Sequence, residues 1–255
     1  MSQMTCSVIR IVTGTTWVNN MAVIKTYDSR DALFDSMAEQ VSAKLAQRLN
    51  SGSSALVVSG GTTPQPLFER LSETPLAWEK VTLLPSDERW LPTDHAASNE
   101  NLIRNSLHQN LASAATVQGL MIGHESAQAA EADLNDKLSS ILDDYAVAIV
   151  GMGLDGHFAS IFPGTAQMAA ALNLDGASLC YGVDATGCPV AGEFTERMTL
   201  SLPAILNADE VFVLITGDEK LDIVKKAIAG DSEVADLPIA KLVSQTKTAV
   251  TICCA

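Results

Sequence analysis

Alternating strand-like and helix-like segments predict an α/β fold for this chain, arranged as a three-layer α/β/α domain with a mostly parallel sheet. Residues 145–150 (YAVAIV) and 211–216 (VFVLIT) are apolar throughout, which is typical of parallel strands covered on both faces. The segments between such runs carry apolar residues at helical spacing. With 47% hydrophobic and 18% charged residues among 255, the chain has enough apolar side chain for the core of one such domain.

The predicted strands alternate with predicted helices. Strands are expected at residues 22–26, 55–59, 81–85, 145–150 and 211–216. The first helix follows a cap at Asp28 or Ser29, and its buried stripe consists of Phe34, Met37, Val41 and Leu45. Thr63 and Pro64 supply the cap and the first-turn proline of a helix that runs through Leu71.

The later helices have recognisable start or stop signals. Ser98 caps a helix whose apolar residues are Leu102, Ile103 and Leu107. Residues 130–142 form another helix, with one face made of Leu134, Leu138 and Ile141. The last predicted helix spans residues 218–229, and Gly230 ends it.

Residues 1–20 show no amphipathic period, whereas a strand pattern begins directly after Met21. We hypothesise that Met21 is the functional start. Residues 1–20 are then an N-terminal extension that is not native or is disordered, and residues 21–255 form a single domain. Mass spectrometry of the natively expressed protein tests this hypothesis, which fails if the N-terminus is Met1 or Ser2.

Charge and composition exclude several classes of partner. Acidic residues outnumber basic ones by 30 to 16, and the net charge of -14 argues against nucleic acid as a partner. No apolar run is long enough to cross a bilayer, so we expect a cytoplasmic protein with no membrane partner. The five cysteines form no C-x-x-C pair and the four histidines have no ligand spacing, which predicts reduced thiols and no metal site.

Polar clusters follow four of the predicted strands at the point where each strand ends. They lie at residues 59–63, 87–89, 155–157 and 217–220. The carboxyl ends of parallel strands meet at one edge of the sheet, where loops converge and helix N-termini point their free N–H groups outward. The clusters together therefore predict a site for a phosphorylated small molecule. We expect the loop-like residues 182–192 to form a mobile segment over it.

The first cluster, Ser59-Gly60-Gly61-Thr62-Thr63, suits phosphate because glycine lets the backbone approach an anion and threonine hydroxyls donate hydrogen bonds. The alternative is an ordinary turn between a strand and a helix. No G-x-x-x-x-G-K-[ST] motif is present, so the turn is not a nucleoside-triphosphate loop of that kind.

The segment that leads into the third cluster contains a formal match to the dinucleotide fingerprint, Gly151-x-Gly153-x-x-Gly156. Pro163 follows too soon for the long helix that such a site requires. We instead interpret this segment as a loop that holds His157 at the sheet edge, where an imidazole suits a general base. A purely structural histidine remains the alternative.

Two further basic residues are candidates for anion binding. Arg197 precedes an apolar stretch, and Lys220 lies in the first turn of a predicted helix. A lysine there opposes the positive end of the helix dipole unless an anion binds beside it. A solvated surface cation is the alternative for both.

Five segments together resemble the 6-phosphogluconolactonase family of the glucosamine-6-phosphate isomerase/lactonase superfamily. They are SGGTTP, LPSDERWLPTDHAASN, GMGLDGHFASIFP, RMTLSLP and TGDEKLDIVKKA, in this order, within a match over about residues 21–255. The resemblance implies a Rossmann-like α/β/α domain. It also implies hydrolysis of 6-phospho-D-glucono-1,5-lactone to 6-phosphogluconate, in the oxidative pentose phosphate pathway, with no metal or organic cofactor.

The same resemblance implies roles for single residues. The phosphate is held by Gly60, Gly61, Thr62, Thr63, Arg197 and Lys220. His157 activates water, Asp155 and Asp87 orient groups around it, and Arg89 lies near the substrate. The group that stabilises the oxyanion is left open. A monomer and a homodimer are both compatible with the sequence.

Two other functions remain open. The related glucosamine-6-phosphate deaminases resemble D-G-H-I-A-F-N-E-P, in which a carboxylate stands where this chain has Phe162. An apolar ring cannot replace that carboxylate, so the lactonase is favoured. A non-catalytic sugar-phosphate sensor is the third candidate, although such a module is expected to have lost His157 or gained a DNA-binding domain.

Overall fold

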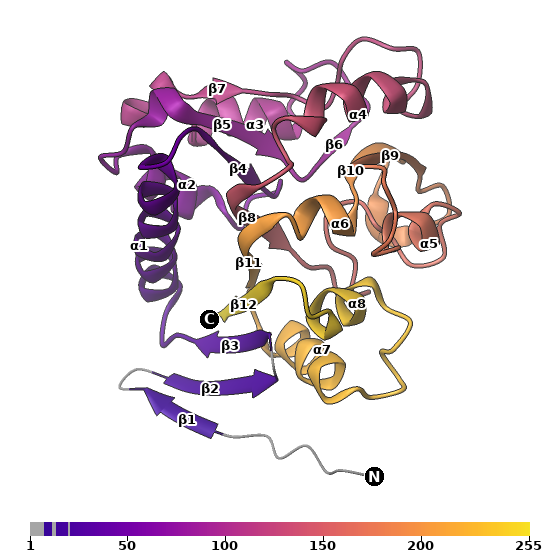
Figure 1. Cartoon of the computed structure of the whole chain (residues 1–255). Helices are drawn as coiled ribbons and strands as arrows, with labels where there is room; N and C mark the ends of the chain where they lie inside the picture. Colours follow the sequence, from indigo (N-terminus) through magenta and orange to yellow (C-terminus); the bar gives the residue numbers. More distant parts are fainter. Residues whose placement is uncertain (1–7, 12–13, 20) are drawn as a thin grey trace.

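A mixed sheet forms the middle layer of the computed structural model, which describes residues 8–11, 14–19 and 21–255 (Figure 1). Within these residues the sheet has nine strands. In spatial order they are β1 (Val8–Ile11), β2 (Gly14–Asn19), β3 (Ala22–Thr26), β12 (Ala249–Cys254), β11 (Ala208–Ile215), β8 (Tyr145–Gly151), β4 (Ser54–Val58), β5 (Val81–Pro85) and β7 (Thr116–Val117). From β3 to β7 all neighbours are parallel, and β1 and β2 add to β3 as an antiparallel pair.

The chain reverses its direction across the sheet between β4 and β8. From β4 it proceeds outward to β5 and β7, and it then returns to β8 and continues through β11 to β12. The loops that leave β4 and β8 therefore diverge at adjacent strand ends. Such a switch point is where open α/β sheets bind ligands.

Helices cover both faces of the sheet. One face carries α1 (Arg30–Leu49), α2 (Gln65–Ser72) and α3 (Asn99–Ser106), and the other carries α4 (Glu131–Ser139), α5 (Met168–Ala171), α6 (Leu202–Ile205), α7 (Asp218–Ala229) and α8 (Pro238–Ser244). In β8, Val147 and Ile149 pack into the hydrophobic core on the face covered by α1, α2 and α3. Ala148 and Val150 pack into the core on the opposite face. The three-layer α/β fold predicted from the sequence is thereby confirmed.

Most predicted elements occur within a few residues of their expected bounds. Ser29 caps α1, because its hydroxyl accepts from Ala32 N at 3.2 Å, and Ser98 caps α3 in the same way. Gly230 ends α7 with a φ of 72°, the left-handed conformation that favours glycine. Short 3₁₀ turns lie at Trp78–Lys80, Asn110–Ala114, Gln128–Ala130 and Pro189–Ala191.

Three local predictions were wrong. Thr63 does not cap α2, since Pro64 occupies the cap position and provides no side-chain hydrogen bond. The helix expected over residues 130–142 ends at Ser139. The predicted loop 182–192 begins inside a strand, β9 (Cys180–Asp184), so only its later part is a connection. Each error concerns a boundary, which depends on neighbouring elements more than on the local pattern.

A second, smaller sheet was not predicted at all. It is antiparallel and joins β6 (Asp87–Arg89), β10 (Glu196–Leu200) and β9. Arg197 lies opposite Arg89 in its register. Strands β1 and β2 also lie in residues 1–20, where the sequence indicated no regular element. The expectation that Met21 is the functional start stays a prediction. Among the described residues, no helix is long and apolar enough to cross a membrane.

Candidate functional site

A pocket of about 270 Å³ opens at the carboxyl ends of the central strands, beside the switch point between β4 and β8. All four polar clusters predicted from the sequence contribute to its lining. The predicted site residues that line it are Gly60, Gly61, Thr63, Asp87, Arg89, His157, Arg197 and Lys220. Thr62 lies in the same turn but outside the lining, and Asp155 reaches the pocket through His157. The structure thus brings together segments about 160 residues apart (60 to 220).

The imidazole of His157 is held by a carboxylate. Its Nδ1 lies 2.6 Å from Oδ1 of Asp155, and the two side chains are only 21% and 26% exposed. We assign the proton to Nδ1, because a carboxylate accepts only from a protonated nitrogen. Nε2 then keeps its lone pair. This is the arrangement that a general base requires.

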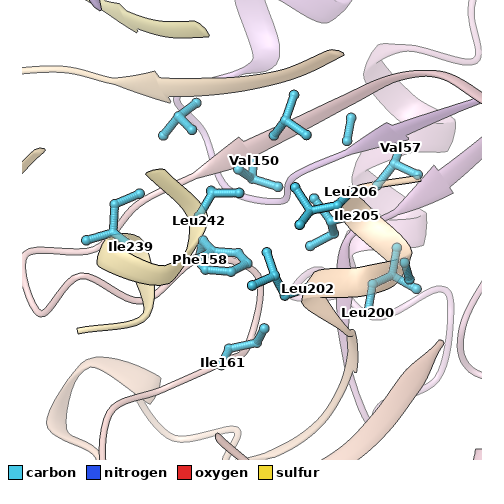
Figure 2. Packing of buried hydrophobic residues seen from close by; sticks show 14 of the residues in the cluster. Val57, Val150, Phe158, Ile161, Leu200, Leu202, Ile205, Leu206, Ile239 and Leu242 are labelled. Atoms are coloured by element: carbon cyan, nitrogen blue, oxygen red, sulfur yellow. The ribbon is translucent and has the colours of Figure 1, made fainter. Parts of the chain in front are cut away.

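Glycine makes room for this pair. A Cβ at Gly153 would lie 2.3 Å from Nδ1 of His157 and 2.5 Å from Oδ1 of Asp155, which no side chain tolerates. The segment after the histidine is anchored in the core, where Phe158 lies beside Leu202 of α6 and Leu242 of α8 (Figure 2). A glycine at position 153 is therefore required by the histidine loop.

The pKa of Asp155 lies below its ordinary value. Partial burial acts to raise this pKa, but the hydrogen bonds from the ring and the backbone N of His157, together with electrostatic attraction, outweigh burial. The carboxylate is therefore ionised at neutral pH.

Asp87 is fixed by three parts of the chain. The hydroxyl of Ser160 donates to its Oδ2 at 2.5 Å, and that of Ser86 donates to its Oδ1 at 3.1 Å. The guanidinium of Arg197 lies 4.0 Å from Oδ2. Ser160 belongs to the same loop as His157, so Asp87 ties β6 to the histidine loop.

Arg197 is a buried cation, 5% exposed. Nε and one terminal nitrogen donate to the carbonyls of Phe194 and Ala191, both at 2.6 Å. Burial lowers its pKa and the charge of Asp87 opposes this effect. The ring of Phe162 lies 5.8 Å from the guanidinium carbon and 4.6 Å from the imidazole of His157. Phe162 therefore separates the two polar groups with an apolar surface.

Arg89 is held from one side only. Its NH1 donates to the carbonyl of Ala97 at 2.7 Å and to Oδ1 of Asn99 at 3.1 Å. Its Nε is buried and has no acceptor among the described residues. NH2 likewise has no hydrogen-bond partner in the part of the chain that the structure describes.

The glycine turn and Lys220 form the open side of the pocket. Gly61 has a φ of 88°, and Gly61, Thr62 and Thr63 are exposed. Lys220 lies in the first turn of α7, and no carboxylate of the described residues pairs with it. Free amides, hydroxyls and an unpaired ammonium suit an anion such as phosphate.

Sequence reasoning missed Asn99 and Ser160. Both stand inside segments that carry the family resemblance, directly after Ser98 and Ala159. Asn99 lines the pocket, and the hydroxyl of Ser160 donates a hydrogen bond to Oδ2 of Asp87. Their short polar side chains in mixed segments give no periodic signal, so the resemblance was the one available indication.

The fold and the pocket define an α/β protein with a cation-lined pocket and a histidine–carboxylate pair. Residues 28–252 match the family of glucosamine-6-phosphate isomerases/6-phosphogluconolactonase, and the chain belongs to this family. The resemblance stated from the sequence is thus confirmed.

Two relatives and two solved structures illustrate the similarity. The 6-phosphogluconolactonase of Pseudomonas putida is 32% identical, covering 86% of this chain and 88% of its own length. That of Rhizobium meliloti (strain 1021) is 33% identical, covering 84% and 90%. A crystal structure of a 6-phosphogluconolactonase from Shewanella baltica OS155 has a TM-score of 0.83 at 35% identity, covering 91% of this chain and 97% of that one. A monomeric glucosamine-6-phosphate deaminase shares the fold at 18% identity.

Proposed function

We propose that this protein hydrolyses 6-phospho-D-glucono-1,5-lactone to 6-phospho-D-gluconate. The observation that carries this proposal is the position of the His157–Asp155 pair in the same pocket as the unpaired Lys220 and the glycine turn. One part suits an activated water and the other suits a phosphoryl group. The similar proteins named 6-phosphogluconolactonase support the same substrate.

The phosphoryl group binds on the open side of the pocket in this proposal. Lys220 supplies charge, and Gly60 to Thr63 supply amides and hydroxyls. Arg197 adds a guanidinium whose position is fixed by two backbone carbonyls. These groups outweigh the net charge of -14 only locally, which favours a small anion over an extended one.

Hydrolysis then proceeds on the histidine side. Nε2 of His157 removes a proton from water as the water oxygen attacks C1 of the lactone. The carbonyl π electrons move to oxygen and form a tetrahedral oxyanion. When this collapses, the bond from C1 to the ring oxygen breaks, and the imidazolium returns the proton to that oxygen. The product is a carboxylic acid, which ionises in water.

Two sets of donors are available for the oxyanion. Gly60 and Gly61, with their backbone amides, and Arg89, with its NH2, line the pocket. Each such donor contributes a few kcal/mol in other hydrolases. We assign no single donor to this role.

Phe162 argues against a deaminase. Its ring contacts the imidazole of His157 at a centroid distance of 4.6 Å, so no carboxylate couples to the histidine from this side. A ring cannot accept or donate a proton there. The exposed His95 packs on Phe194 and does not line the pocket. It therefore cannot transfer a proton in place of the carboxylate that the deaminases have at the position of Phe162.

The test is a direct rate comparison. The purified protein should accelerate lactone hydrolysis well above the spontaneous rate, followed as acid release at constant pH. It should show no release of ammonia from glucosamine 6-phosphate. Ammonia release without accelerated lactone hydrolysis would reject the lactonase in favour of a deaminase. Binding of the sugar phosphate with neither reaction would favour a non-catalytic sensor.

A further inference from the structure

Asn99 joins two parts of the pocket that the sequence places far apart. It is the first residue of α3 and is 2% exposed. Its Nδ2 donates to the backbone carbonyl of Asp87 at 2.7 Å, and its Oδ1 accepts from NH1 of Arg89 at 3.1 Å. One amide therefore holds both ends of β6 by donating to one residue and accepting from the other.

The same amide also abuts the glycine turn. A Cβ added at Gly60 would lie 2.0 Å from Oδ1 of Asn99 and 2.4 Å from its Cγ. The backbone of Gly60 is not in the left-handed region, so the contact with Asn99 alone forbids a side chain there. Asn99 thus packs between the glycine turn and Arg89.

A buried carboxylate holds Asn99 in turn. Oε1 of Glu88 accepts from the backbone N of Asn99 at 2.7 Å, and its Oε2 accepts from the backbone N of Glu100 at 2.8 Å. The hydroxyl of Ser98 also donates to Oε2 at 3.0 Å. Glu88 is 0% exposed and lies at the N-terminus of α3, where the helix dipole favours a negative charge. The carboxylate of Glu88 therefore holds the first turn of α3, and with it Asn99, in place beside the pocket.

We propose that Asn99 is a positioning residue that sets the Arg89 guanidinium toward the substrate. NH1 of Arg89 is engaged by Ala97 and Asn99 and Nε is buried, which leaves NH2 for a substrate oxygen. Asn99 acts through Arg89 and not through the phosphoryl grip at Lys220. This inference rests on the proposed lactonase activity.

The experiment is a pair of double-mutant cycles on kcat/KM for lactone hydrolysis, corrected for the spontaneous rate. Asn99→Ala is combined with Arg89→Ala in one cycle and with Lys220→Ala in the other. The matched control is Asn101→Ala, which removes an exposed amide from the same helix turn. Thermal melting of each variant reports whether it is folded.

We expect Asn99→Ala to lower kcat/KM between about 10-fold and 100-fold, because small displacements of a substrate-contacting group are costly. The loss should nearly vanish when Arg89 is already alanine, and should multiply with the loss from Lys220→Ala. Asn101→Ala should match the wild type. Independent effects of the Asn99 and Arg89 substitutions would overturn the proposal.

A second variant keeps the test decisive if Asn99→Ala does not fold. Asn99→Asp preserves the size and the acceptor for Arg89 but loses the donation to Asp87. It should retain more activity than the single Arg89→Ala variant. A folded Asn99→Asp protein whose loss is independent of Arg89 would overturn the assignment. Wild-type protein without lactonase activity would instead refute the proposed function, which separates the two failures.

Discussion

The two sides of the pocket differ in how far the protein satisfies their polar groups. On the histidine side, Asp155 holds His157 and Ser160 holds Asp87, with distances of 2.6 and 2.5 Å. On the open side, the glycine turn is exposed and Lys220 has no carboxylate partner among the described residues. The histidine side is thus organised before a ligand arrives, whereas the open side depends on the ligand for its partners.

This difference separates two tasks. Groups that take part in a reaction must already be oriented, since orientation lost at that step raises the barrier. Groups that bind an anion lose water when the anion arrives and gain charge-assisted hydrogen bonds in exchange. We therefore expect substitutions on the histidine side to act on kcat and those on the open side to act on KM.

Replacing His157 should give the largest effect. His157→Ala removes the proposed base, and kcat should fall about 10²-fold to 10⁴-fold, the usual contribution of general acid–base catalysis. Binding of 6-phosphogluconate, measured by calorimetry, should change little. A His157→Ala protein with unchanged turnover would place the base elsewhere and remove the contrast between the two sides.

Adding a side chain at position 153, beside His157 and Asp155, should give the second-largest effect. Gly153→Ala drives a Cβ to 2.3 Å from the imidazole and should lower kcat by about 10²-fold through misplacement. The control is Gly52→Ala, because nothing lies within 4 Å of a Cβ there. Steady-state kinetics of both variants checks this, and equal activities would show that the pair tolerates displacement.

Removing the ammonium of Lys220 should act on binding. Lys220→Ala should raise KM about 10-fold or more with a smaller change in kcat, as expected for the loss of a hydrogen bond to a charged group. Lys225→Ala, an exposed site on the same helix, serves as the control. The difference from wild type should shrink at high ionic strength if the lysine acts by charge. A pure kcat effect would contradict the division of tasks.

The smallest effects concern stability against pH, where Asp155 and Glu88 should act with opposite signs. The lowered pKa of Asp155 contributes stability above the unfolded pKa, and this contribution is lost below about pH 4 as the folded carboxylate is protonated. Burial raises the pKa of Glu88, although four hydrogen bonds to its carboxylate oppose this shift. Its contribution to the free energy of unfolding therefore grows as pH falls toward about 4.

Urea denaturation at several pH values measures both slopes. Asp155→Asn should reduce the loss of unfolding free energy below about pH 4. Glu88→Gln should remove the gain in unfolding free energy that the wild type shows as the pH falls toward about 4. Unchanged slopes in both variants would show that neither carboxyl has a shifted pKa.

Five strands of the large sheet, five of the helices, the caps at Ser29 and Ser98 and the stop at Gly230 were predictable from the sequence. Each depends on neighbours a few residues away, which periodicity and capping chemistry report directly. The four polar clusters were also placed correctly at one edge, because parallel strands share their carboxyl ends.

Tertiary structure decided what no local pattern contains. The small sheet pairs Arg89 with Arg197, 108 positions apart (197 minus 89), and short polar strands of this kind carry no apolar alternation. Likewise, Asn99 acquires its place only because Glu88, Gly60 and Arg89 meet around it. The sequence by itself determined which groups reach the pocket, since strand ends are set by local chemistry. The packing of distant segments determined which of those groups are held in place and which remain free for a ligand.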